Sequence, residues 1–139
     1  MNEWKGYALA AALFGGLTAV FAKLGVTGIP SHMATFLRTV VVIAFTAVVL
    51  TVQKGWANPA ALTPKALVFL VLSGIATGLS WLCYFKALQM GPTSLVAAVD
   101  KLSLVVAVLL AVVFLKDSLS LSQWAGVGFM VVGTLLVIH

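Results

Sequence analysis

The sequence predicts an all-α membrane protein, a bundle of five transmembrane helices. Its 139 residues are 63% hydrophobic and only 8% charged, far from the composition of soluble proteins. The apolar residues form continuous runs without a ten-residue alternation, which argues against a β-barrel and leaves helices as the spanning structure. Because one span needs about 20 apolar residues, five spans and short loops account for the whole length.

Each predicted span covers one apolar run, and together the spans form a single transmembrane domain over residues 1–139. The predicted spans are 4–24, 34–52, 65–88, 94–115 and 122–138. The first run follows a short charged start, as the core of a signal peptide does. It reaches Leu24 without a cleavage site, so we expect it to be retained as a helix.

Short breaks between the runs carry residues typical of helix ends. Residues 28–31 (Gly-Ile-Pro-Ser) end one helix and can cap the next, and residues 91–94 (Gly-Pro-Thr-Ser) repeat that pattern. Thr63 supplies a capping hydroxyl in front of Pro64, which suits the first helical position. Residues 120–123 (Ser-Leu-Ser-Gln) match a capping box that opens the last helix.

The lysines of the loops predict an orientation. Those on the N-terminal side of the membrane are Lys5, Lys54, Lys65 and Lys116, whereas the loops on the other side carry only His32. Lys23 and Lys86 can extend toward that other side, but the N-terminal side still carries more lysines, four against two. The positive-inside rule therefore favours a cytoplasmic N-terminus.

In the half of the membrane away from the N-terminus, four basic residues and a single acid lie inside the predicted spans. They are Lys23, Arg38, Lys86, Lys101 and Asp100. Such an excess of positive charge is hard to hold in hydrocarbon unless water or an anion enters. The sequence therefore predicts a polar vestibule suited to a carboxylate or a phosphate group.

Each embedded charge also has an explanation that needs no substrate. Lys23 and Lys86 lie close enough to the interface to extend their ammonium groups to water. Arg38 lies deeper, and an ion pair with Asp100 would account for both residues. Asp100 and Lys101 are the deepest. As helix neighbours they point about 100° apart, so we expect one to meet a neighbouring helix and the other a cavity.

The third span carries a stripe of polar and aromatic residues at helical spacing. Its members are Ser73, Thr77, Ser80, Trp81 and Tyr84. The hydroxyls can simply bond back to their own backbone or to a neighbouring helix. Alternatively the stripe lines a substrate path, in which Trp81 and Tyr84 hold a flat or apolar part of the ligand.

No motif of an enzyme or a metal site is present in the sequence. His32 and His139 lie far apart, and Cys83 is alone within a span, so neither a metal site nor a disulfide is predicted. There is no phosphate loop and no nucleophile elbow. The basic residues are scattered singly and form no nucleic-acid-binding patch. We expect no catalysis, no cofactor and no nucleic-acid partner.

Several short motifs, in order and spacing, resemble the EamA domain of the drug/metabolite transporter superfamily. They lie at residues 21–25 (FAKLG), 37–38 (LR), 81–88 (WLCYFKAL), 96–103 (VAAVDKLS), 114–120 (FLKDSLS) and 123–126 (QWAG). The resemblance covers essentially the whole chain, and its Asp-Lys-Leu-Ser stretch is similar in particular to the single-repeat, five-helix bacterial and archaeal members. Asp117 replaces the usual glutamate of the family, a conservative departure in a loop.

The resemblance implies a secondary transporter of the inner membrane that works by alternating access. Longer relatives contain two five-helix repeats of opposite orientation, so one repeat is expected to form a homodimer, with the antiparallel arrangement favoured despite the lysine bias. The substrate would be a small metabolite such as an amino acid or an organic acid. We expect it to meet seven residues: Arg38, Thr77, Trp81, Tyr84, Asp100, Lys101 and Ser103.

Two other functions stay open at this point. Cationic drug efflux of the small multidrug resistance type requires a lone embedded carboxylate that exchanges protons for a cation. Here Asp100 is flanked by Lys101 and outnumbered by bases. A non-transporting assembly partner or regulatory subunit would fit the small size and the odd number of spans, but it would not explain the clustered charges.

Overall fold

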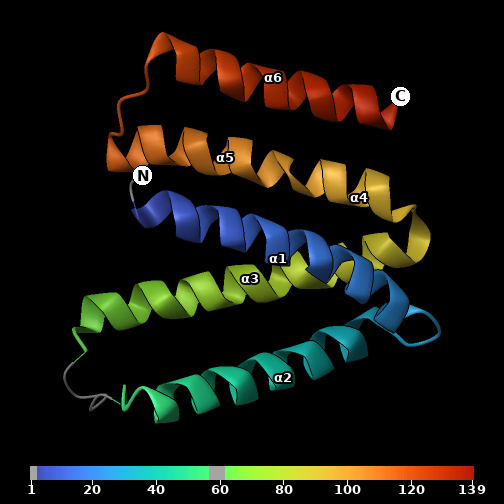
Figure 1. Ribbon diagram of the computed structural model, residues 1–139, viewed down its shortest axis with the longest axis vertical. Coiled ribbons are helices and arrows are strands. Elements are labelled where there is room, and N and C mark those ends of the chain that lie inside the picture. Colours follow the sequence, from blue (N-terminus) through green and yellow to red (C-terminus); the bar gives the residue numbers. More distant parts are fainter. Residues whose placement is uncertain (1–2, 57–61) are drawn as a thin grey trace. The chain divides into compact units, whose positions relative to one another are not determined.

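The computed structural model describes residues 3–56 and 62–139, nearly all of them helical (Figure 1). The elements are α1 (Glu3–Val26), α2 (Ser31–Val52), α3 (Pro64–Met90), α4 (Thr93–Asp100), α5 (Leu102–Leu110), the π-helix η2 (Ala111–Leu115) and α6 (Leu121–Ile138). Within the described ranges, five helices are long and apolar enough to cross a membrane, and α4, α5 and η2 together form the fourth. The predicted all-α membrane fold with five spans is confirmed.

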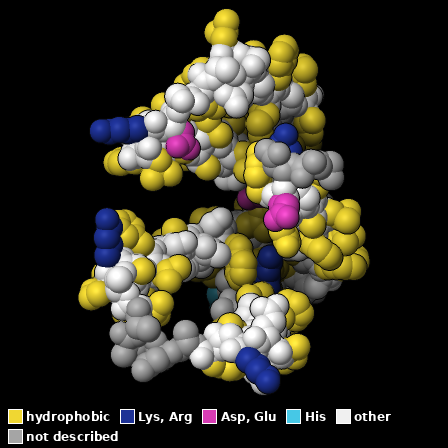
Figure 2. Space-filling model, turned by 60° about the vertical axis from the view of Figure 1, so that its left-hand side comes forward, with side chains coloured by type: hydrophobic (Ala, Val, Ile, Leu, Met, Phe, Trp, Pro, Cys, Tyr) yellow, Lys and Arg dark blue, Asp and Glu magenta, His cyan; other side chains and the backbone are white. Residues whose placement is uncertain are grey.

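Apolar side chains cover the outside of these helices, and charged side chains interrupt them at isolated points (Figure 2). Among the described residues, the buried apolar side chains are Ala19, Val26, Ala34, Phe85 and Leu88. Large apolar residues along every span are exposed instead. Such a surface is unfavourable in water but is solvated by lipid tails. The chain is therefore an integral membrane protein.

The chain forms two compact units. Unit 1 comprises Met1–Val20 and Met90–His139, and unit 2 comprises Phe21–Gln89. In unit 1, α6 packs along α4 and α5 (Figure 1). The hydroxyl of Thr134 on α6 is 3.5 Å from the Ala98 carbonyl oxygen of α4, so a polar contact accompanies this packing. The single transmembrane domain expected from the sequence stays a prediction.

Polar contacts join the end of α1 to the end of α3 within unit 2. The Lys23 ammonium donates a hydrogen bond to the Leu88 carbonyl. The side-chain amide of Gln89 donates to the carbonyls of Ile29 and Val26, at 2.5 and 3.5 Å. Carbonyls at the end of a helix have no donor within their own helix, so they need partners of this kind. These contacts fix the last turn of α3 against α1 and the loop that follows it.

Two predicted helix caps are present and two are not. Thr63 Oγ1 accepts a hydrogen bond from the Ala66 N–H at 3.3 Å, and Ser120 forms the predicted capping box at the start of α6. In contrast, α2 and α4 begin after Pro30 and Pro92, and neither has a side-chain cap. Both prolines are extended and occupy the N-cap position, so the hydroxyl residues that follow them are already helical.

Candidate substrate-binding site

Arg38 of α2 lies against two aromatic rings of α3. Its guanidinium carbon is 4.2 Å from the centre of the Trp81 ring and 5.6 Å from the centre of the Phe85 ring. Trp81 and Phe85 share a face of α3 because they are four residues apart. A guanidinium at these distances is attracted to the negative faces of the rings. The three side chains therefore form one cluster.

Tyr84 completes this group, which we call the arginine–aromatic cluster (Arg38, Trp81, Tyr84 and Phe85). The Tyr84 ring meets Phe85 edge-on, with centroids 6.4 Å apart and an interplanar angle of 73°. Phe85 is only 4% exposed, whereas the other three side chains are half-buried. A buried ring thus supports a guanidinium that stays partly accessible.

The charge environment of the cluster is entirely positive within its own unit. Residues 21–89 contain no Asp and no Glu. Arg38 therefore has no carboxylate partner in unit 2, although its guanidinium carries five N–H donors suited to oxygen acceptors. The aromatic rings contact one side of the guanidinium, but they offer no conventional hydrogen-bond acceptor to its N–H groups. An arginine in this state is well suited to bind an anionic group.

Thr77 lies one turn before Trp81 on α3, and its hydroxyl is already engaged. The hydroxyl donates a 2.9 Å hydrogen bond to the Ser73 carbonyl of the preceding turn. This hydrogen bond agrees with the first interpretation of the polar and aromatic stripe of the third span, in which the hydroxyls bond to the backbone of their own helix. The Thr77 oxygen keeps its capacity to accept a hydrogen bond.

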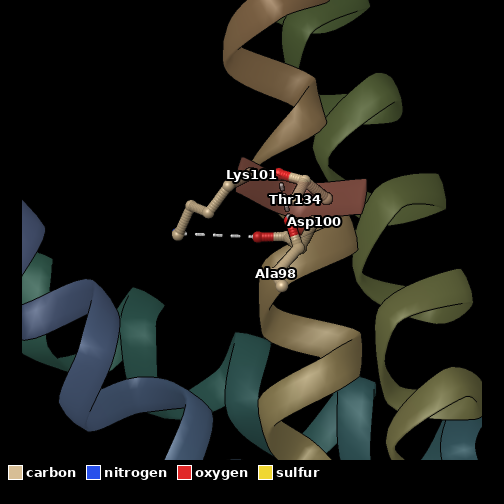
Figure 3. A network of polar contacts seen from close by, with 4 residues as sticks. All are labelled: Ala98, Asp100, Lys101 and Thr134. Atoms are coloured by element: carbon tan, nitrogen blue, oxygen red, sulfur yellow. Dashed lines mark hydrogen bonds and ion pairs between the residues drawn. The ribbon is translucent and has the colours of Figure 1, made fainter. Parts of the chain in front are cut away.

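Asp100 and Lys101 pair with each other in unit 1 (Figure 3). Lys101 Nζ is 3.7 Å from Asp100 Oδ2, with the side chains 56% and 36% exposed respectively. The two residues lie where α4 ends at Asp100 and α5 begins at Leu102. The expectation that one of them meets a neighbouring helix and the other a cavity stays a prediction.

The break between α4 and α5 interrupts the fourth span. The Lys101 N–H bonds to the Ala98 carbonyl three residues back, at 3.2 Å, in place of the regular helical bond. The Thr134 hydroxyl approaches the same carbonyl from α6 (Figure 3). Irregular backbone at membrane depth is tolerated where protein or a cavity covers it, and broken helices form the sites of many transporters. Ser103 lies exposed in the first turn after this break.

The seven predicted site residues thus fall into two groups. Arg38, Thr77, Trp81 and Tyr84 lie in unit 2, and Asp100, Lys101 and Ser103 lie in unit 1. An Arg38–Asp100 ion pair would have to join the two units, and it stays a prediction. Sequence reasoning missed Phe85, although its spacing of four residues from Trp81 is a signal that could have found it.

Charged and aromatic side chains held within five apolar spans are features of a membrane transport protein. The chain belongs to the EamA-like transporter family, whose model matches residues 4–139. The family resemblance deduced from the motifs is confirmed, and the protein is a membrane transporter.

Two relatives extend this comparison. The chain is 45% identical over 136 residues to an uncharacterized transporter in the cobO 3′ region of a Sinorhizobium species, with 98% of this chain and 96% of the relative covered. It is 26% identical over 129 residues to an uncharacterized protein of Methanocaldococcus jannaschii, with 93% and 91% covered. No solved structure matches the chain.

Proposed function

We propose that this transporter is a secondary transporter that moves a small organic solute, such as an amino acid or an organic acid, across the inner membrane of a prokaryote. The observation that carries this proposal is the arginine–aromatic cluster. Arg38 lies 4.2 Å from the Trp81 ring in a unit without Asp or Glu. A membrane-embedded cation of this kind requires a partner, and a carboxylate-bearing solute supplies one.

The other candidate residues take supporting roles. Trp81 and Tyr84 offer ring surface to the apolar part of the solute, and the buried Phe85 ring supports Arg38. Thr77 and Ser103 offer hydroxyl oxygens. The Asp100–Lys101 pair lies at the break of the fourth span, where backbone can rearrange between two conformations. The proposal assigns no catalytic step, no cofactor and no metal to any of these residues.

Transport would proceed by alternating access in a homodimer. One chain is a single five-helix repeat, and in this architecture a second repeat completes the path. We favour the antiparallel dimer because inverted repeats build one site from both halves. This requires some copies to insert with the N-terminus outside, although the loop lysines favour a cytoplasmic N-terminus.

A thermal-shift screen of the detergent-purified protein tests the substrate class directly. Any ligand that binds only the folded state raises the apparent stability, by about 2.7 kcal/mol at a hundred times its dissociation constant. We expect carboxylate-bearing metabolites to raise the unfolding temperature, and Arg38→Gln to abolish the shift. Solutes that bind would then be tested for uptake into liposomes.

Two results would contradict the proposal. Strong stabilisation by quaternary ammonium dyes, with all acids inert, would favour cationic drug efflux of the small multidrug resistance type. Liposomes that move no solute under any gradient would favour an assembly or regulatory role.

A further inference from the structure

The aromatic rings around Arg38 offer the chemistry by which proteins bind organic cations. Faces of Trp, Tyr and Phe attract a quaternary ammonium group through the negative charge of the π system. In this protein the guanidinium carbon of Arg38 already lies 4.2 Å from the Trp81 ring and 5.6 Å from the Phe85 ring. A residue of the chain thus occupies the position that an organic cation would take.

We propose that Arg38 acts as an internal cation that fills a latent organic-cation site, and that this occupancy makes the transport site select carboxylates. The proposal rests on the proposed function, because it takes the arginine–aromatic cluster as part of the substrate path. It adds that one side chain both attracts the anion and excludes the cation.

Steric exclusion is the first of two effects that support this inference. The indole face in contact with the guanidinium is no longer open to another group. Phe85 cannot replace it, because that side chain is only 4% exposed. An incoming cation would have to displace Arg38 from the rings.

Electrostatic repulsion is the second effect, and it acts in the same direction. Unit 2 carries five basic residues and no acid, so no carboxylate within it offsets the charge of an incoming cation. These five basic residues, all within positions 21–89, are Lys23, Arg38, Lys54, Lys65 and Lys86. A carboxylate meets the opposite situation, because the N–H donors of Arg38 can hydrogen-bond its oxygens.

Substitutions at Arg38 separate these effects. Arg38→Gln removes the charge and exposes the Trp81 face, so we expect it to lose carboxylate binding and to gain binding of quaternary ammonium ions. Arg38→Lys keeps a positive charge but loses the planar fork of donors. We expect Arg38→Lys to bind carboxylates more weakly and still to exclude quaternary ammonium ions.

The test uses Trp81 as a fluorescent reporter in the full-length protein. Replacing Trp4, Trp56 and Trp124 by Phe leaves Trp81 as the sole tryptophan of the four in the sequence. Sodium benzoate and tetraethylammonium chloride are titrated separately, and gel filtration and circular dichroism confirm that each variant is folded. A control protein keeps Trp124 and carries Phe at the other three tryptophan positions, so its emission should not respond to either probe.

We expect an inversion of preference. The parent should respond to benzoate and not to tetraethylammonium, whereas Arg38→Gln should show the reverse, with each apparent dissociation constant changed by at least tenfold. If Arg38→Gln does not fold, Arg38→Met removes the same charge with a side chain better tolerated in lipid.

Two outcomes would overturn the inference. A folded Arg38→Gln that binds neither probe would show that no latent cation site exists, and it would leave the proposed transport of acids intact. A parent that binds tetraethylammonium with Arg38 in place would contradict the internal-cation role. Failure of the proposed function itself would be recognised separately, by liposomes that take up no acid although benzoate binding is intact.

Discussion

The side-chain amide of Gln89 donates a 2.5 Å hydrogen bond to the backbone carbonyl of Ile29. Gln89 lies in the last turn of α3, and Ile29 lies in the loop between α1 and α2. The same amide is 3.5 Å from the Val26 carbonyl, which also accepts a hydrogen bond from the Ile29 N–H at 3.4 Å, so one side chain contacts both carbonyls of this turn. This contact holds together two segments about 60 residues apart in sequence.

Removing this amide should destabilise the protein. We expect Gln89→Ala to lower the free energy of unfolding by about 1–2 kcal/mol, because the partly buried Ile29 carbonyl loses the amide donor. Denaturant or thermal unfolding in detergent measures the change. Gln53→Ala is the matched control, since Gln53 is exposed at the end of α2. Equal losses in the two variants would show that the Gln89 contact has no special role.

Gly28 provides a second prediction, because its φ of +82° lies in the left-handed region. A Cβ added at Gly28 or at Gly25 would meet no heavy atom within 4 Å, so the two sites differ in backbone conformation and not in space. We expect Gly28→Ala to cost about 1–2 kcal/mol of stability. Gly25→Ala, within α1, should be neutral or stabilising by about 0.5–1 kcal/mol. Indistinguishable unfolding temperatures for the two variants would exclude backbone strain as the cause.

The Asp100–Lys101 pair predicts a rescue by double substitution. Asp100→Asn leaves the Lys101 ammonium without its 3.7 Å partner, so we expect a lower yield of folded protein. Asp100→Asn combined with Lys101→Gln removes both charges and should restore the yield. Transport is then compared per folded molecule. Wild-type transport by the folded single variant would remove Asp100 from the mechanism, and a double variant worse than both singles would contradict the pairing.

The antiparallel dimer predicts labelling of each terminus from both sides of the membrane. Cys83 is first replaced by Ser, and a single cysteine is then introduced at Asn2 or at His139. A membrane-impermeant reagent applied to intact cells should label a substantial fraction of each variant, and the remainder should react only after permeabilisation. Labelling of each terminus from one side alone would rule out the antiparallel arrangement.

The spans and two of the four expected caps were predictable from local sequence, whereas contacts between helices were not. The five spans follow from continuous apolar runs, and the caps at Thr63 and Ser120 follow from hydroxyls just before a helix. The interruption at Lys101 was not predicted, because no glycine or proline marks it and Lys101 itself keeps a right-handed helical conformation. The contact between Arg38 and Trp81 was also inaccessible, since helical spacing places each residue on a face but does not say which faces meet.

The Asp100–Lys101 pair also bears on how the chain enters the membrane during synthesis. A lone Asp or Lys at the centre of a span disfavours insertion by about 2.5–3.5 kcal/mol. Here the two opposite charges are consecutive residues, so they can neutralise each other as soon as the ribosome has made them. No other helix has to be in place first. We therefore expect the fourth span to enter the translocon as a nearly neutral segment, without α6 packed against it.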